Sequence, residues 1–195
     1  LMLSPEAVAA HKDLKIVYTP IHGSGVEIVP EFLAKLGFEN VYHVPEQDVI
    51  DGNFPTVKSP NPEEPGALAM ALAVADKEGA DLVMATDPDA DRIGIAVRDN
   101  EGKMVLLNGN QTGSILTYYI LRRWSELGKL DGKQFIVKTI VTTELMRAIA
   151  EKYGVKVYNV LTGFKWIADI IKKNEGIATF VCGGEESYGF NVGDF

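Results

Sequence analysis

Short apolar runs alternate along the chain with longer segments in which apolar residues recur every three or four positions. A short apolar run bounded by turn residues is typical of a buried strand, whereas the longer period is typical of an amphipathic helix. Strands are expected over residues 15–18, 41–44, 82–85, 93–97, 104–107, 135–138, 155–159, 178–181 and 190–192, and helices over 26–36, 62–77, 111–127, 143–153 and 164–173. This alternation predicts an α/β fold.

The order of these elements repeats along the chain. Residues 108–195 reproduce the order strand, helix, strand, helix, strand, strand that is found in residues 1–107. Two similar small α/β domains explain this repeat better than one continuous sheet does. We therefore expect one domain over residues 1–107 and a second over 108–195, each a mixed sheet of about four strands with flanking helices.

The helix expected over 62–77 has recognisable start signals. Asn61 is a good N-cap residue, Pro62 fits the first helical position, and Glu64 completes a pattern that is similar to a capping box. The helix is therefore predicted to begin at Pro62.

Charge and composition narrow the possible partners. The chain has 195 residues with 19 basic and 27 acidic side chains, a net charge of −8, and no cluster of Lys and Arg. Nucleic-acid binding depends on neutralising phosphates, so this balance argues against a nucleic-acid partner.

The longest apolar stretch lies within Ala67–Ala75, far short of the ~18 residues that a membrane span needs. A single cysteine, Cys182, suits a reducing compartment, and a cytoplasmic location is expected.

The most informative segment follows the expected strand 82–85 directly. It places Asp87, Asp89 and Asp91 at alternate positions, so that three carboxylates can lie on one side of an extended loop. Like charges that converge in this way repel one another unless a cation lies among them. Oxygen ligands select Mg²⁺, Ca²⁺ or Mn²⁺. The segment therefore predicts a divalent metal site, with a solvated acidic turn as the alternative.

A calcium-binding EF-hand also begins with alternating acids, but this segment does not fit one. With Asp87 as the first position, Arg92 stands where the EF-hand loop needs Gly, and Arg98 stands where it needs the bidentate Glu. The planar guanidinium of Arg92 suits a phosphoryl group held beside the metal, and charge balance within the loop is the alternative.

Two further segments offer groups for a sugar phosphate. Residues 184–189, Gly-Glu-Glu-Ser-Tyr-Gly, place two acids and a hydroxyl on a turn after an apolar strand, where carboxylates can bind sugar hydroxyls or face solvent. Residues 162–166, Thr-Gly-Phe-Lys-Trp, open a helix whose backbone N–H groups, with Lys165, can bind phosphate. A surface lysine on an amphipathic helix is the alternative for Lys165.

Other residues with reactive or aromatic side chains are expected to be structural. Ser24 and His22 lie in a Gly-containing turn between a strand and a helix, and such turns are common, so a nucleophile and base are not expected there. Cys182 follows an apolar strand and is expected to pack in the core. Trp124 and Trp166 are expected to be core or interface residues.

Together these motifs resemble the α-D-phosphohexomutase family, which includes phosphoglucomutase and phosphomannomutase. The resemblance runs along essentially the whole chain, through residues 19–25, 51–55, 60–63, 87–92, 162–165 and 184–189. The acidic segment followed about a hundred residues later by Gly-Glu-Glu-Ser is highly specific.

The resemblance implies a place in a larger protein and a role for each motif. Family members have four domains, and the chain resembles the second domain and most of the third, whose C-terminal end is missing. The residues implied to bind Mg²⁺ are Asp87, Asp89 and Asp91. Those implied to be catalytic are Arg92 and Lys165. Those implied to bind substrate are Thr162, Gly163, Glu185 and Ser187.

The activity implied by the resemblance is the interconversion of hexose 1-phosphate and hexose 6-phosphate through a hexose bisphosphate and an enzyme phosphoserine. The chain departs from the family in one decisive respect, because it lacks the Thr-Ala-Ser-His-Asn-Pro type of loop whose serine carries the phosphoryl group. The expected partners are therefore hexose phosphate, hexose bisphosphate, and the missing first and fourth domains of the same chain.

Two other functions are compatible with the residues. A non-catalytic sugar-phosphate-binding module would keep the binding loops without the nucleophile. A haloacid-dehalogenase-type phosphatase also has Asp-x-Asp after a buried strand, but it usually has Thr or Val where this chain has Asp91. The phosphatase is the weaker of these alternatives.

Overall fold

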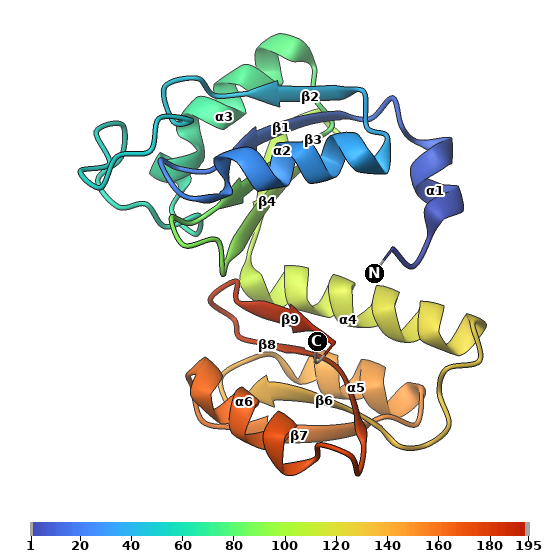
Figure 1. The fold of residues 1–195 in the computed structure, drawn as a ribbon. Helices are drawn as coiled ribbons and strands as arrows, with labels where there is room; N and C mark the ends of the chain where they lie inside the picture. The colour runs from blue at the N-terminus through green and yellow to red at the C-terminus, as the bar shows by residue number, and fades with distance from the viewer. Residues whose placement is uncertain (1, 194–195) are drawn as a thin grey trace. The chain divides into compact units, whose positions relative to one another are not determined.

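The computed structural model describes residues 2–193, which form two compact units (Figure 1). The N-terminal unit comprises Met2–Leu107, and the C-terminal unit begins at Asn108. Each unit is a mixed sheet with helices packed on it, so the α/β fold class is confirmed.

The sheet of the N-terminal unit has five strands, each at a predicted position, where about four per sheet were expected. Its order is β2 (Asn40–His43), β1 (Lys15–Thr19), β3 (Leu82–Thr86), β4 (Ile93–Arg98) and β5 (Met104–Leu107). The pairs of β1 with β2 and with β3 are parallel, whereas β3 with β4 and β4 with β5 are antiparallel. The antiparallel pairing means that the acidic segment forms the tight connection between the adjacent strands β3 and β4.

Helices cover both faces of this sheet. Helix α3 (Pro65–Glu78) packs on one face through small residues such as Ala71 and Ala75, which share a buried cluster with Val17 and Val83 of the sheet. Helix α2 (Gly25–Leu36) lies in front of β1 and β3 in Figure 1. Because side chains alternate along a strand, Tyr18 points away from the α3 face and reaches Gly25 of α2.

The C-terminal unit repeats the arrangement with four strands. Its order is β7 (Lys156–Val160), β6 (Gln134–Thr139), β8 (Thr179–Gly184) and β9 (Phe190–Val192). Strand β6 pairs in parallel with β7 and β8, and β9 is antiparallel to β8. The Gly-Glu-Glu-Ser segment is therefore the connection between β8 and β9.

Alternation along β6 also divides the core of this unit. Phe135 and Val137 pack with Ile167 of α6 (Phe164–Lys173) on one face. The intervening positions face α4 (Gly109–Glu126) and α5 (Glu144–Lys152), where Met146 is fully buried. The last of these positions is Lys138, which is fully buried.

The prediction for the start of α3 was wrong by three residues. The helix begins at Pro65 and not at Pro62, and Glu64 has extended backbone angles of φ −87° and ψ 123°. A proline disfavours helical angles at the residue before it, so Pro65 prevents Glu64 from joining a helix that starts earlier. Asn61 instead accepts a hydrogen bond from the Glu63 amide at 3.0 Å, which closes a local turn.

The remaining helix lies near the N-terminus. Helix α1 (Pro5–Ala10) was not predicted; it is short, and none of its residues is buried. No helix among residues 2–193 combines the length and the apolar character that crossing a bilayer requires.

Candidate functional site

The acidic segment brings its three predicted carboxylates together. Asp87 continues directly from β3 and is 1% exposed, whereas Asp89 and Asp91 are exposed. One oxygen from each of the three carboxylates lies within 4.8 Å of the other two. Ala90 has φ +59°, and its amide bonds to the Asp87 carbonyl at 3.0 Å, so a tight turn folds the segment back on itself.

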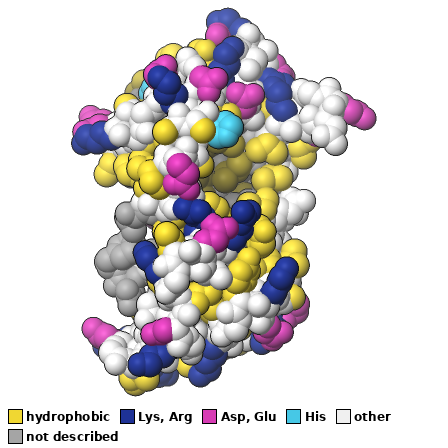
Figure 2. Space-filling model, turned by 90° about the vertical axis from the view of Figure 1, so that its right-hand side faces the viewer, with side chains coloured by type: hydrophobic (Ala, Val, Ile, Leu, Met, Phe, Trp, Pro, Cys, Tyr) yellow, Lys and Arg dark blue, Asp and Glu magenta, His cyan; other side chains and the backbone are white. Residues whose placement is uncertain are grey.

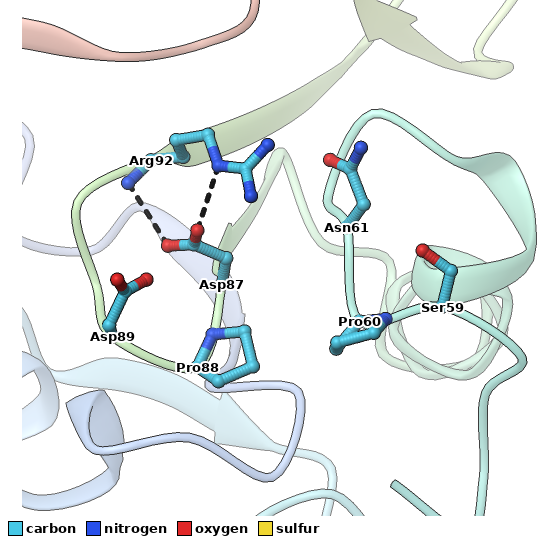
Figure 3. Close-up of a pocket in the computed structure, with 7 residues that line it drawn as sticks. All are labelled: Ser59, Pro60, Asn61, Asp87, Pro88, Asp89 and Arg92. Atoms are coloured by element: carbon cyan, nitrogen blue, oxygen red, sulfur yellow. Dashed lines mark hydrogen bonds and ion pairs between the residues drawn. The ribbon is translucent and has the colours of Figure 1, made fainter. Parts of the chain in front are cut away.

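Arg92 closes the segment onto its first residue. Its backbone amide donates to Asp87 Oδ1 at 3.0 Å and its Nε donates to Oδ2 at 2.8 Å, as Figure 3 shows. Its Nε also lies 3.7 Å from Asp91 Oδ1. Arg92 balances one of three negative charges, so the segment retains an excess of negative charge.

This excess affects Asp91. Burial raises the pKa of Asp91 most, and the nearby negative charges of Asp87 and Asp89 raise it further, against the opposing effect of Arg92. A bound cation would relieve the repulsion between the carboxylates.

The residues present fit a magnesium ion. Opposite ligands at about 2.1 Å from Mg²⁺ are about 4.2 Å apart, which is compatible with the spacing of these oxygens. Each Asp87 oxygen can accept a second bond besides the one from Arg92. All three donors are carboxylates, which suit a hard cation.

A pocket of about 450 Å³ lies beside this cluster. Its lining residues come from two segments: Ser59, Pro60, Asn61, Asp87, Pro88, Asp89 and Arg92. In Figure 3 the Arg92 guanidinium and the Asn61 side chain lie on opposite sides of the pocket. None of residues 59–61 was predicted to line a site: Asn61 was expected only as a helix N-cap, and residues 60–63 only as part of the family resemblance.

The turn between β1 and α2 anchors the acidic segment. The amide and the hydroxyl of Ser24 both donate to the Pro88 carbonyl, at 2.9 and 3.0 Å. A side chain at Gly23 would overlap Pro88, so only glycine permits this close approach. The His22 ring is buried, with its nitrogens 2.7 Å from the Val49 carbonyl and 2.8 Å from the Thr56 hydroxyl. These contacts favour the structural interpretation of Ser24 and His22.

In the C-terminal unit, the structure brings two of the predicted substrate-binding positions together. Glu185 Oε1 accepts a hydrogen bond from the Gly163 amide at 2.6 Å, so residues 162–165 lie beside residues 184–189. Ser187 is half-buried. Thr162 and Lys165 are exposed, and Lys165 Nζ lies 5.3 Å from the centre of the Trp166 ring, without a contact to Glu185 or Ser187 among the interactions found in residues 2–193.

Sequence reasoning missed one cluster, formed by the buried side chains of Lys138, Thr139 and Thr142 together with the half-buried Glu186. A lysine at the end of an otherwise apolar strand was the signal that could have pointed to it.

Cys182 packs in the core as expected, whereas for Trp166, expected in the core or at an interface, the core position is wrong. Cys182 is buried, and burial raises the pKa of its thiol to about 12, which makes it a packing residue. Trp166 is 38% exposed and therefore lies outside the core.

Charged side chains are mixed on the surface. On the face in Figure 2, Lys and Arg side chains are interspersed with Asp and Glu side chains and do not gather in one continuous band.

Known proteins match almost the whole chain. Residues 4–102 match the family description "Phosphoglucomutase/phosphomannomutase, alpha/beta/alpha domain II", and residues 108–195 match the description of domain III of the same family. The chain is 42% identical over 178 residues to a phosphoglucomutase of Staphylococcus aureus, and 40% identical over 183 residues to one of Staphylococcus haemolyticus. It covers 32% and 33% of the length of these two relatives.

Solved structures agree with these matches. A crystal structure from Thermus thermophilus, described as a phosphomannomutase, superposes with a TM-score of 0.71 at 28% identity, covering 96% of this chain and 41% of that one. An N-acetylphosphoglucosamine mutase of Aspergillus fumigatus, solved with GlcNAc-6P and magnesium, shares the fold with a TM-score of 0.64 at 16% identity, covering 97% of this chain and 38% of that one. The resemblance drawn from the motifs is confirmed: the chain belongs to the phosphoglucomutase/phosphomannomutase family.

Proposed function

We propose that this chain supplies the metal-binding and sugar-binding parts of a phosphohexomutase that interconverts hexose 1-phosphate and hexose 6-phosphate. The observation that carries the proposal is the cluster of three carboxylate oxygens within 4.8 Å, with Arg92 held against Asp87. The similarity to staphylococcal phosphoglucomutases supports the same reaction. The magnesium and hexosamine phosphate bound by the Aspergillus mutase are ligands of the class proposed here.

In the N-terminal unit, Asp87, Asp89 and Asp91 would hold Mg²⁺. When bound, this ion neutralises negative charge on the oxygens of a phosphoryl group during transfer. Asp87 also orients Arg92, because its carboxylate fixes Nε and leaves the terminal nitrogens of the guanidinium available to a phosphoryl oxygen. The pocket beside this cluster is large enough for such a group.

In the C-terminal unit, Glu185 and Ser187 would bind ring hydroxyls of the sugar. The Glu185 carboxylate accepts one bond from Gly163 and keeps further acceptor positions for hydroxyl donors. Thr162, just before α6, would contact a phosphate group through its backbone N–H, and Gly163 would line the same site with its own amide bonded to Glu185. Lys165 is exposed on the first turn of the same helix and is proposed as a catalytic cation.

The proposed partners are hexose phosphates, a hexose bisphosphate and two further domains of the same chain. These domains would supply the phosphoserine, because this chain has no Thr-Ala-Ser-His-Asn-Pro type of loop. The cytoplasm is the proposed compartment, on the argument from the single cysteine.

A second candidate is a non-catalytic module that binds sugar phosphates, since residues 162–165 and 184–189 lie side by side and can bind a ligand without a nucleophile. The test is a coupled assay of glucose 1-phosphate conversion to glucose 6-phosphate by a full-length protein that carries this chain. Asp89→Asn should lower kcat/KM by about 100- to 1000-fold, because it replaces a charged carboxylate ligand of the metal by a neutral amide. Asp13→Asn, at an exposed position outside the cluster, should leave kcat/KM unchanged. Absence of turnover in the unsubstituted protein would favour the binding module.

A further inference from the structure

Glu186 lies between Glu185 and Ser187 in the sequence, but its carboxylate is directed into the protein. Its Oε2 accepts from the hydroxyls of Thr139 and Thr142 at 3.1 and 3.2 Å, and these two hydroxyls are 2.6 Å apart. Each hydroxyl has one proton, so two of the three contacts are hydrogen bonds at any moment. Both threonines are buried, at 0% and 3% exposure. The Glu186 side chain is therefore held by two side chains that themselves have little freedom.

Lys138 fixes the segment that carries these threonines. Its side chain is 0% exposed, and Nζ donates to the carbonyls of Thr139 and Thr142 at 3.1 and 2.8 Å. The same atom donates to Asn159 Oδ1 at 3.2 Å and forms an ion pair with Glu144 Oε1 at 2.9 Å. A buried ammonium group is costly unless its protons are all bonded, so these contacts tie residues 139–142 to β6, β7 and α5.

The start of α4 supports the segment 185–187 from another direction. A side chain at Gly109 would overlap the Glu186 carbonyl, so the first turn of the helix lies directly against the backbone of this segment. One residue later, Asn110 Oδ1 accepts from the Thr143 amide at 2.8 Å. The segment 185–187 is thus held by the start of α4 and by residues 139–142.

We propose that Glu186 is a positioning residue that sets the places of Glu185 and Ser187 through its bonds to Thr139 and Thr142. This inference rests on the proposed function, in which Glu185 and Ser187 bind sugar hydroxyls. The neighbouring acids then have different roles: Glu185 faces Gly163 and the substrate, and Glu186 joins its segment to the part of the unit fixed by Lys138.

Two variants of Glu186 in a full-length protein carrying this chain separate positioning from direct sugar contact. Glu186→Ala removes the acceptor for both hydroxyls, and it should lower kcat/KM for a hexose 1-phosphate by about 10- to 100-fold by misplacing the sugar contacts. Glu186→Gln retains an acceptor oxygen, so it should restore most of that loss. A kcat/KM for Glu186→Gln as low as that of Glu186→Ala, or no loss in Glu186→Ala, would overturn the proposal.

A variant on the other side of the contact tests the same connection. Thr142→Val removes one hydroxyl while keeping the shape of the side chain, and its effect should not add to that of Glu186→Ala, because both break one network. Additive losses would contradict the proposal.

Hydrogen exchange at the amides of residues 185–189 gives a readout that does not depend on turnover. Exchange should be faster in Glu186→Ala than in Glu186→Gln, whose exchange should match that of the unsubstituted protein. If Glu185→Gln left turnover unchanged while this exchange pattern held, the sugar-binding role proposed for Glu185 would fail and the positioning role of Glu186 would stand. Equal exchange in all three proteins would overturn the positioning role itself.

Discussion

The segment between β3 and β4 and the segment between β8 and β9 occupy the same place in two sheets of matching strand order. Both carry carboxylates, but the groups around those carboxylates differ. Arg92 donates to Asp87, whereas Asp89 has no hydrogen-bond donor or ion-pair partner among residues 2–193. In the other segment Glu185 accepts from a backbone amide and Glu186 from two hydroxyls.

The difference suits the two segments to the two kinds of ligand proposed for them. Three carboxylates that share the donors of a single arginine and repel one another leave room for a cation. Burial raises the pKa of Asp91 most, and repulsion from Asp87 and Asp89 raises it further. Carboxylates that are already held by neutral donors keep a fixed orientation and spare acceptor positions, which suits neutral hydroxyl ligands. The strand order sets where each segment lies in its sheet, and the hydrogen-bond donors around the carboxylates determine which ligand those carboxylates suit.

The largest expected effect comes from separating both segments from the rest of a mutase. The 195-residue chain alone should show no mutase turnover with Mg²⁺ and hexose bisphosphate, because a metal and a sugar site cannot store the phosphoryl group between its two transfers. The measurement is the coupled glucose 1-phosphate assay beside the full-length protein. Turnover by the purified chain that Ser24→Ala abolished would place the nucleophile in the turn after β1.

A smaller effect is expected when a carboxylate in the segment between β8 and β9 loses its charge but keeps its shape. Glu185→Gln in the full-length protein should lower kcat/KM by about 10- to 100-fold, since hydrogen bonds to a charged group contribute about 1.5–3 kcal/mol. Glu175→Gln, an exposed position of the same unit, serves as the control and should have no effect. Unchanged kinetics in folded Glu185→Gln would remove Glu185 from the sugar site.

The smallest effects test how each segment is supported. Gly23→Ala would overlap Pro88 and Gly109→Ala would overlap the Glu186 carbonyl, so each should lower the free energy of unfolding by about 1–3 kcal/mol. Gly66→Ala on α3 meets nothing within 4 Å and should raise that free energy by at most about 1 kcal/mol. Urea unfolding of the three variants measures the difference. Equal stabilities would show that neither segment needs its close glycine contact.

Much of the fold follows from local patterns, and the site follows only in part. The periodicity predicted most strands and helices because each signal lies within a few neighbouring residues. The start of α3 was missed because Pro62 and Pro65 both suit a first helical turn, and the second overrides the first through its effect on Glu64.

The supporting contacts had no local signal. The alternating acids at 87–91 identified a candidate metal site, because the spacing itself brings like charges together. The bonds from Thr139 and Thr142 to Glu186, by contrast, join residues 47 and 44 positions apart. Such contacts depend on the pairing of β6 with β8, which no window of sequence contains.

The central claim is that the segment between β3 and β4 binds a divalent cation while the matching segment of the C-terminal unit does not. Titration calorimetry of the 195-residue chain with Mg²⁺ tests it most directly, with Asp89→Asn and Glu185→Gln compared under the same conditions. One Mg²⁺ per chain should bind, Asp89→Asn should lose this binding, and Glu185→Gln should retain it. Equal Mg²⁺ binding by the unsubstituted chain and Asp89→Asn would contradict the claim.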